Sequence, residues 1–312
     1  MRNDGVTGTI GRQEWLKPAE EGLQNVVHKA FQFSGGRQIK NFLHGTWAGH
    51  PLHVILTDIP IGAWTAAIVF DALDSMSTGR QYRIAADTAL SLGLAGAIGA
   101  AATGLTDWQD IDPPARRIGL VHGLLNVASV ALFGTSLVAR RRGARATGRS
   151  LAALGYAVSV AAARLGGNLV YGQKIGVDHS SSEKLPDEFT PVLSESDLDE
   201  GKPVRAEHNG TPILLVRRGA QIYGLAETCS HLGGPLSEGK LDGDVIQCPW
   251  HGSRFSIRVG QVVDGPAVHP QPCLEARVRD GQVEVRKADC RSSRAHATQS
   301  PAKEQPRTGT MG

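Results

Sequence analysis

Two short segments in the last third of the chain each carry one cysteine and one histidine. They read Cys-Ser-His and Cys-Pro-Trp-His, sixteen residues separate them, and the four residues are Cys229, His231, Cys248 and His251. Thiolates and imidazoles are ligands of zinc and of iron–sulfur centres. A structural zinc site usually takes both cysteines from one segment and both histidines from another. The mixed order therefore favours a binuclear centre, with two sulfurs on one metal and two ring nitrogens on the other; a zinc site is the alternative.

The longer motifs around these residues, CSHLGGPL and CPWHGSRF, resemble the two halves of the Rieske family of [2Fe–2S] domains. The resemblance implies that Cys229 and Cys248 bind one iron and that His231 and His251 bind the other. Because neutral imidazoles replace two thiolates, the cluster carries less negative charge. Its reduction potential should therefore lie between about −150 and +300 mV, above the roughly −400 mV of all-cysteine plant-type clusters.

Positions around the four ligands indicate a branch of that family. Quinol-oxidising members carry a disulfide between two further cysteines, and Gly234 and Trp250 stand at those positions here. Phe255 replaces the tyrosine usual in that branch, whereas the Ser253 hydroxyl is retained and is expected to donate to a cluster sulfur. Pro266 belongs to a GPA triplet that corresponds to the proline loop covering the cluster. The chain thus resembles the ferredoxin and oxygenase branch, and we expect a potential in the lower half of the range.

The segment 191–288 has the alternating pattern of short strands. Turn signals such as NG and DG separate the runs PVRAEH, TPILLVR, QIYGLA, DVIQC, RFSI, LEARVR and QVEVRK. This pattern predicts an antiparallel all-β domain over 191–288, and the resemblance of its two motifs implies that it is a Rieske domain. The polar, serine-rich stretch 173–190 is expected to be a linker, and 289–312, low in apolar residues, a disordered tail.

The chain before the linker contains four long apolar stretches: Val54–Leu73, Ile84–Leu105, Ile118–Ala139 and Leu151–Tyr171. Each is long enough to cross a hydrocarbon core of about 30 Å, which needs roughly 20 residues. We therefore expect a polar N-terminal segment over 1–45 and a four-helix membrane domain over 46–172. The expected fold class is an α + β multidomain chain, a four-span transmembrane helical bundle followed by the β domain. A helical bundle buried in a soluble protein is the alternative.

Lysine and arginine are distributed unevenly between the loops of the predicted membrane domain. The first and third loops hold seven arginines and the second holds two: Arg80, Arg83, Arg140, Arg141, Arg142, Arg145 and Arg149 against Arg116 and Arg117. The positive-inside rule places the first and third loops in the cytoplasm and the β domain outside. The missing disulfide would equally suit a reducing cytoplasm, so the side stays open, with the extracytoplasmic side favoured.

Three histidines accompany the predicted membrane helices. His50 and His53 belong to an HPLH pattern that resembles an uncharacterised family of bacterial four-helix membrane proteins, and His122 opens the third span. With four spans, all three lie at the face that carries the β domain. Histidines on neighbouring helices can hold a b-type haem or contact a quinone; as alternatives they are interfacial hydrogen-bonding residues or helix caps.

Two charged residues fall inside the apolar stretches, at similar depths. Asp58 lies in the first stretch and Arg164 in the fourth. Because an unpaired charge there is costly, we expect an intramembrane ion pair; the alternative is that Arg164 reaches the interface.

These features together predict a membrane-anchored protein that transfers single electrons. The net charge of +3 is too small to indicate a nucleic-acid partner. We expect redox partner proteins, quinone and membrane lipid as partners, and no catalytic substrate site of its own. A cluster-gated redox sensor or transporter, or a component of an oxygenase system, are the alternatives. For the oxygenase, His44, His50, His53 and Asp58 are the only candidate iron site.

Overall fold

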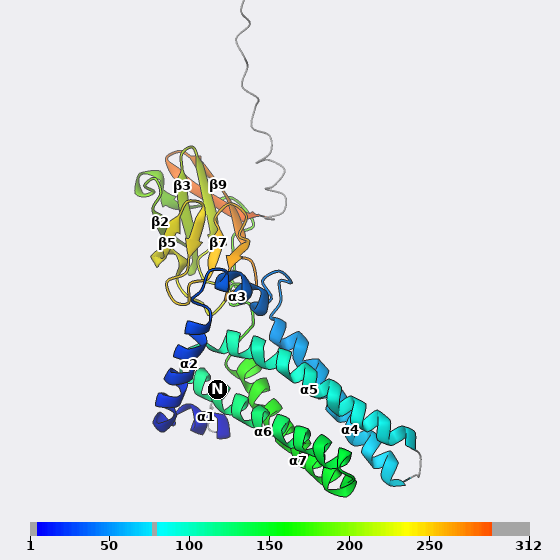
Figure 1. Ribbon diagram of the computed structural model, residues 1–312. Helices are drawn as coiled ribbons and strands as arrows, with labels where there is room; N and C mark the ends of the chain where they lie inside the picture. The colour runs from blue at the N-terminus through cyan, green and yellow to red at the C-terminus, as the bar shows by residue number, and fades with distance from the viewer. Residues whose placement is uncertain (1–4, 77–79, 289–312) are drawn as a thin grey trace, which may run out of the picture.

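The computed structural model describes residues 5–76 and 80–288. Its helices form an elongated body, and the β domain sits at one end of it (Figure 1). The segment expected to be a tail, 289–312, lies outside the described residues.

Four long helices make up the elongated body: α4 (Leu52–Met76), α5 (Arg80–Trp108), α6 (Ala115–Arg141) and α7 (Arg145–Gly167), the last continued by a π-helical turn at Asn168–Gly172. All four are long and apolar enough to cross a membrane. Large apolar side chains face outward from them, such as Ile98 at 73% and Val127 at 67% exposed. A soluble protein would bury such residues, so they suit a lipid surface. The predicted fold class is confirmed.

The membrane domain consists of two equivalent helical hairpins. α4 packs along α5 and α6 along α7, with fewer contacts between the hairpins. Pairs on α4 and α6 match at a spacing of 69 residues: His53 with His122, Trp64 with Phe133, Asp71 with Arg140. Pairs on α5 and α7 match at a spacing of 62 residues: Gly93 with Gly155, Ala100 with Ala162, Gly104 with Gly166. The two hairpins are therefore an internal duplication.

Contacts across this duplication hold the hairpins together. Trp64 and Phe133 stack with ring centroids 4.2 Å apart. About two helical turns after Trp64 and Phe133, Arg140 makes two hydrogen bonds to Asp71, one of them 2.7 Å long. The Arg140 side chain is fully buried, so it relies on these carboxylates for its stability.

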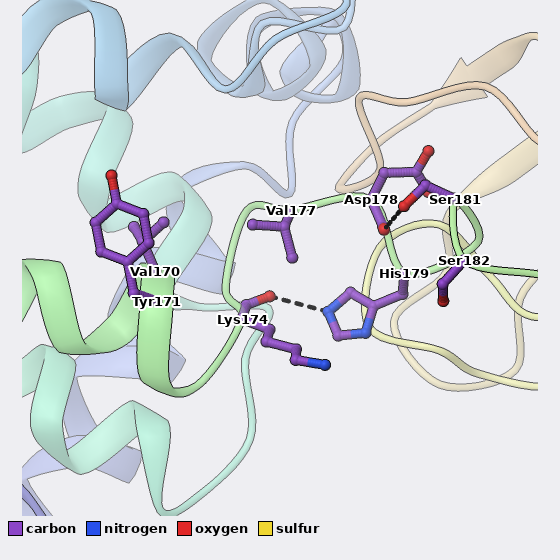
Figure 2. A pocket seen from close by; sticks show the side chains of 8 residues that line it. All are labelled: Val170, Tyr171, Lys174, Val177, Asp178, His179, Ser181 and Ser182. Carbon is purple, nitrogen blue, oxygen red and sulfur yellow. Dashed lines mark hydrogen bonds between the residues drawn. The ribbon is translucent and has the colours of Figure 1, made fainter.

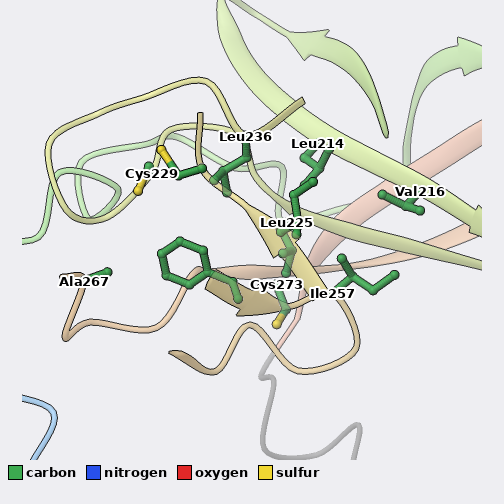
Figure 3. Close-up of a cluster of buried hydrophobic side chains, with 11 residues drawn as sticks. Leu214, Val216, Leu225, Cys229, Leu236, Ile257, Ala267 and Cys273 are labelled. Carbon is green, nitrogen blue, oxygen red and sulfur yellow. The ribbon is translucent and has the colours of Figure 1, made fainter. Parts of the chain in front are cut away.

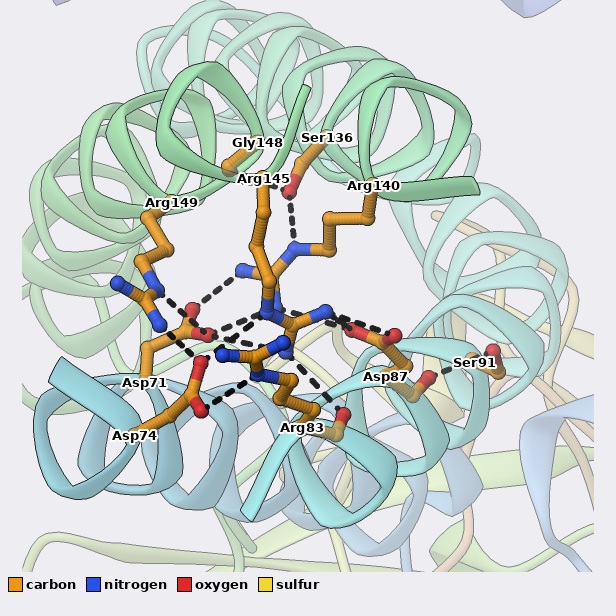
Figure 4. Close-up of polar contacts among 10 residues, drawn as sticks. All are labelled: Asp71, Asp74, Arg83, Asp87, Ser91, Ser136, Arg140, Arg145, Gly148 and Arg149. Carbon is orange, nitrogen blue, oxygen red and sulfur yellow. Dashed lines mark hydrogen bonds and ion pairs between the residues drawn. The ribbon is translucent and has the colours of Figure 1, made fainter. Parts of the chain in front are cut away.

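The buried pair belongs to a larger ion network at the end of the bundle remote from the β domain (Figure 4). Three carboxylates from the first hairpin meet four guanidinium groups: Asp71, Asp74 and Asp87 with Arg83, Arg140, Arg145 and Arg149. Most of the arginines that the charge count assigned to loops are therefore neutralised by specific partners.

Asp58 and Arg164 are not part of any ion pair in the described residues, contrary to the expectation of an intramembrane pair. Both residues are exposed. The buried stripe of α4 runs through Pro60, Trp64 and Ala67, and Asp58 lies off it. The charges thus point away from the bundle, where no partner is needed if they reach the membrane interface.

The N-terminal segment is helical and packs on the membrane domain at the end near the β domain. It forms α1 (Val6–Gly11), a 3₁₀ turn (Glu14–Leu16), α2 (Lys17–Ala30) and α3 (Gly36–His44). Glu20 of α2 has no exposed surface and pairs with Arg117 at 3.2 Å and Arg116 at 3.5 Å. These arginines start α6, so the segment braces the α5–α6 connection.

The β domain is built from two antiparallel sheets. The larger sheet contains β1 (Thr190–Ser194), β2 (Pro203–His208), β3 (Thr211–Arg218), β4 (Gln221–Ala226), β9 (Cys273–Arg279) and β10 (Gln282–Ala288), in the order β1-β10-β9-β4-β3-β2. The smaller sheet contains β5 (Lys240–Asp242), β6 (Val245–Gln247), β7 (Arg254–Ser256) and β8 (Val262–Asp264), in that order. Side chains of both sheets share a core that includes Cys229 and Cys248 (Figure 3).

Replacing Arg140 with Gln should destabilise the membrane domain strongly. The change leaves Asp71 buried without its principal cation, which typically costs about 3–5 kcal/mol. Arg141 is exposed and makes no ion pair in the described residues, so Arg141→Gln removes the same charge and should cost under about 0.5 kcal/mol. Denaturant titration of both variants in detergent measures their free energies of unfolding. Equal losses of stability in the two variants would contradict the role given to the buried pair.

Candidate metal centre

The two cysteine–histidine segments form loops of the same construction. One follows β4 and the other follows β6 directly. In each, the cysteine N–H donates to the carbonyl five residues on, Cys229 to Gly234 and Cys248 to Ser253, both at 2.8 Å. In each, the fourth residue after the cysteine is a glycine with positive φ, 83° at Gly233 and 77° at Gly252. That conformation favours glycine, so both motifs need it there to turn the loop.

The loops bring the two cysteine sulfurs together. Both cysteines are buried, at 1% and 3% exposure, and neither is in a disulfide. The Cys229 thiol donates a hydrogen bond to Cys248, which lowers the pKa of Cys248 to about 7 and raises the pKa of Cys229. Backbone N–H groups of the same loop point at each sulfur, from His231 and Leu232 in the first loop. These donors favour thiolate, the form that binds metal.

The imidazoles form a second pair beside the sulfurs. The rings of His231 and His251 meet edge to face, with centroids 5.1 Å apart. Burial, followed by the neighbouring His251, lowers the pKa of His231 to about 3, so its ring is neutral and ready to bind metal. Nε2 of His251 lies 3.0 Å from the Asp112 carboxylate, which leaves Nδ1 for a metal.

The four side chains suit two metal ions better than one. Among residues 5–76 and 80–288, no three His, Cys, Asp or Glu side chains are arranged to hold a single ion. A structural zinc ion needs four ligands around one point, whereas a two-iron cluster needs two protein ligands for each iron. The paired sulfurs and paired imidazoles therefore fit a binuclear cluster.

The residues that the motif analysis expects around the ligands lie in or next to the two loops. A side chain on Gly234 would stand 2.8 Å from the Cys248 sulfur and 3.0 Å from the Trp250 ring, so only glycine fits there. Ser253 is fully buried, and its Oγ accepts a hydrogen bond from the Ala267 N–H at 3.0 Å. Its own proton is thus free for another acceptor. Pro266 is buried beside Ala267.

The ligand loops are docked on the membrane domain. Leu232 of the first loop packs on an apolar cluster that includes Trp108, the last residue of α5, and Ile111 of the α5–α6 connection. His251 of the second loop reaches Asp112 of the same connection. Asn41 of α3 accepts from the Gly265 N–H at 3.0 Å. Three separate contacts thus close the side of the site that carries the imidazoles. The motif analysis missed all of them; the acidic run TDWQDID was the available signal.

A buried histidine lies behind this interface. His44 of α3 is 1% exposed, and its Nδ1 lies 2.7 Å from the Asp107 carboxylate and its Nε2 3.4 Å from Asp110. Burial opposes protonation, but both carboxylates outweigh it and raise the pKa of His44. Lys40 also pairs with Asp110, at 2.8 Å. Burial would raise the pKa of Asp110, but His44 and Lys40 outweigh burial and lower it. A charged network therefore underlies the docked loops.

Comparison with known proteins agrees with this geometry. Residues 188–275 match the family described as Rieske [2Fe–2S] domain. Over 95 residues the chain is 39% identical to ferredoxin CarAc of Metapseudomonas resinovorans, a match that spans 30% of this chain and 89% of that ferredoxin. The chain belongs to the Rieske family. Its Rieske domain supports a [2Fe–2S] cluster.

Other similarities cover the two parts of this Rieske protein separately. The ferredoxin component of biphenyl 2,3-dioxygenase from Rhodococcus jostii (strain RHA1) is 37% identical over 82 residues, 26% of this chain and 77% of that component. A solved complex of reduced oxygenase and oxidized ferredoxin in carbazole 1,9a-dioxygenase matches 31% of this chain and 92% of the other, at 37% identity and a TM-score of 0.30. Residues 49–179 match a family described as predicted membrane protein (DUF2231). Together with the four apolar helices, this indicates a multi-pass membrane protein.

The structure separates the three histidines predicted for the membrane part of the Rieske protein. His53 and His122 lie at equivalent places of the two hairpins, near the end that carries the Rieske domain. His50 is exposed, and its ring contacts the carbonyl of the next residue, Pro51, at 3.2 Å. The sequence spacing of His50 and His53 therefore does not make them one site.

A pocket of about 400 Å³ lies next to the centre, between the end of α7 and residues 174–182 (Figure 2). His179 lines it, with Nε2 bonded to the Lys174 carbonyl at 2.9 Å and its backbone N–H bonded to Ser230 of the first ligand loop at 3.1 Å. None of the four cluster-ligand candidates lines it. The stretch expected to be a linker is thus held against the Rieske domain by specific bonds.

The stability of the docked protein should depend on pH through His44. The raised pKa of His44 means that its contribution is present below the unfolded value of about 6.5 and is lost as pH rises through the folded value. The charges that face it are Asp107, Asp110 and Lys40, with His231 nearby. His44→Gln should remove this stabilisation, with the deficit relative to the unmodified protein shrinking as pH rises.

Unfolding midpoints in detergent across about pH 5.5 to 9 measure the effect. His28→Gln, at an exposed position of α2, is the control and should leave the profile unchanged. A deficit in His44→Gln that grows with pH would contradict the assigned sign.

Proposed function

We propose that this chain is a membrane-anchored Rieske protein that transfers single electrons. Cys229 and Cys248 would bind one iron of the cluster, and His231 and His251 the other. When bound, the cluster accepts and releases one electron at a time. The observation that carries the proposal is the pairing itself, in which two equivalent loops place sulfur beside sulfur and imidazole beside imidazole.

The surrounding residues set the electrostatics of electron transfer. Backbone N–H groups directed at both sulfurs, together with the Ser253 hydroxyl, stabilise the added negative charge of the reduced state. Phe255 supplies no hydroxyl where quinol-oxidising relatives have tyrosine. We therefore expect a midpoint potential in the lower half of the range from about −150 to +300 mV.

The docking of the ligand loops favours an electron path on the membrane side. The imidazole edge of the site faces Asp112 and the apolar cluster around Trp108, so this edge is closed to a large soluble protein. Trp250, 56% exposed beside the Cys248 loop, offers a second approach. Relatives include the ferredoxin component of a dioxygenase. We therefore expect a soluble redox protein as the partner at Trp250, and a haem or a quinone as the partner in the membrane.

The two alternatives receive less support from the structure. An oxygenase would need a mononuclear iron site, but His44 is engaged with Asp107 and Asp110 while His50 and Asp58 are exposed, so the candidate set is not assembled. A cluster-gated sensor or transporter has no observation in its favour here. On the charge count of the loops, we place the Rieske domain outside the cytoplasm.

A redox titration of the full-length protein in lipid vesicles tests the proposal. Material prepared without oxygen should contain two irons and two acid-labile sulfides per chain and show the EPR signal of a reduced, imidazole-ligated cluster. The signal should follow a one-electron Nernst curve within the lower half of the range above. Cys248→Ser should lose the signal, whereas His208→Gln, which changes a histidine of β2 that is not one of the four ligands, should keep it. Zinc in place of iron, or a two-electron curve, would refute the proposal.

Replacing Asp112 with Asn should raise the midpoint potential. The negative carboxylate beside His251 disfavours the added electron, and Asn keeps an oxygen acceptor while removing the charge. The Asp112 side chain is 66% exposed, so solvent screens it. An effect on the order of 1 kcal/mol corresponds to about 40 mV for one electron. The same titration measures it, with Asp58→Asn, exposed on α4, as the matched control; a fall in potential would contradict this contact.

A further inference from the structure

The duplicated hairpins hold two histidines in the same manner. Nδ1 of His53 on α4 lies 2.8 Å from the Ala100 carbonyl of α5, and Nδ1 of His122 on α6 lies 2.8 Å from the Ala162 carbonyl of α7. Both carbonyls belong to the neighbouring helix of the same hairpin. The imidazoles are therefore oriented by two copies of one arrangement.

A glycine makes room for each ring. A side chain on Gly104 would stand 2.7 Å from Cε1 of His53, and one on Gly166 would stand 3.0 Å from Cε1 of His122. Each glycine lies four residues after the carbonyl that its histidine contacts. The same set of histidine, carbonyl and glycine therefore occurs at equivalent positions of both hairpins.

The hydrogen bonds fix the tautomer of both rings. A carbonyl oxygen only accepts, so Nδ1 of each neutral imidazole carries the proton and Nε2 keeps its lone pair. Within the described residues, no hydrogen bond is assigned to Nε2 of His53, and Nε2 of His122 lies 3.2 Å from the Asn126 amide. Asn126 also donates to the His122 carbonyl at 3.0 Å, so it keeps a partner if that nitrogen binds elsewhere.

Two such lone pairs suit a metal and do not suit the carbonyl oxygens of an oxidised quinone. A quinone carbonyl is an acceptor and requires an N–H donor, which Nε2 of these tautomers does not offer. An iron ion with two open axial positions requires two imidazole lone pairs, each ring held by a bond from its other nitrogen to a carbonyl. The chemistry of the site therefore favours axial ligation of a haem.

Two apolar clusters of the membrane domain lie on either side of the level of the two histidines. One buried cluster surrounds Trp64 and Phe133, and another surrounds Trp108 and Leu120 at the end near the Rieske domain. His53 and His122 lie between these levels and belong to neither cluster. They are partly buried, on helices that face each other through Trp64 and Phe133.

We propose that His53 and His122 are the axial ligands of a b-type haem held between the two hairpins. The inference rests on the proposed function, because it identifies the membrane partner of the cluster. Gly104, beside His53, precedes Asp110 by six residues on α5 and its extension, which corresponds to about 9 Å along a helix. A haem at this level would exchange electrons with a cluster docked on the α5–α6 connection.

The test uses full-length protein expressed with ample haem and purified in detergent. A haem extraction assay should find about one b-type haem per chain, and the visible and EPR spectra should show a six-coordinate, low-spin iron. Loss of only the outer partner of a metal ligand costs about 10–100-fold in affinity. His53→Ala and His122→Ala remove the ligands themselves, so each should reduce haem content by at least about tenfold. His50→Ala, three residues from His53 and exposed, should keep the haem.

Two readouts keep the outcomes separate. The EPR signal of the reduced cluster should persist in His53→Ala and His122→Ala, which shows that these variants fold. Conversely, Cys229→Ser should lose that signal and keep the haem, so failure of the electron-carrier proposal is distinguishable from failure of this one. Protein that contains the cluster but no haem, haem that survives both histidine changes, or a bound quinone without haem would overturn the inference.

Discussion

The contact between the cluster loops and the α5–α6 connection is the constraint on which the rest of this molecule depends. Leu232 enters the apolar cluster around Trp108 and Ile111, and His251 reaches Asp112. The N-terminal helices brace the same connection through Glu20, which is fully buried against the arginines at the start of α6. The Rieske domain is therefore not merely tethered. Its imidazole edge is held against the membrane part by these contacts.

The motif carries most of what could be predicted about the centre. Cysteine, histidine and glycine spacing anticipates two loops of one construction, because the bond from Cys229 to Gly234 and the positive φ of Gly233 are local properties. Alternation predicts strands such as β3 and β10. It does not predict β5 or β8, which are only three residues long. β5 pairs with β6 and β8 pairs with β7 because the chain folds back between the strands of each pair. The roles of Asp112 and His44 depend on contacts across more than 60 residues, which no local pattern encodes.

The membrane part shows the same division between local and distant information. Apolar length predicts the four helices, since each must satisfy its backbone within the bilayer. The pairing of charges does not follow from depth alone. Asp58 and Arg164 lie off the buried faces, whereas Asp71 lies on the stripe of Trp64 and Ala67 and so meets Arg140. The duplication becomes evident when the hairpins are compared in space, because identical residues such as His53 and His122 then occupy equivalent positions.

Oriented EPR of the reduced cluster tests the docked arrangement most directly. Vesicles containing the full-length protein would be dried into stacked multilayers, and the spectrum recorded as the membrane plane is turned in the magnetic field. If the imidazole edge is fixed on the α5–α6 connection, every cluster has one orientation relative to the membrane, and the principal g-value intensities change with angle. A spectrum that does not change with angle would show a freely rotating head domain and contradict the account.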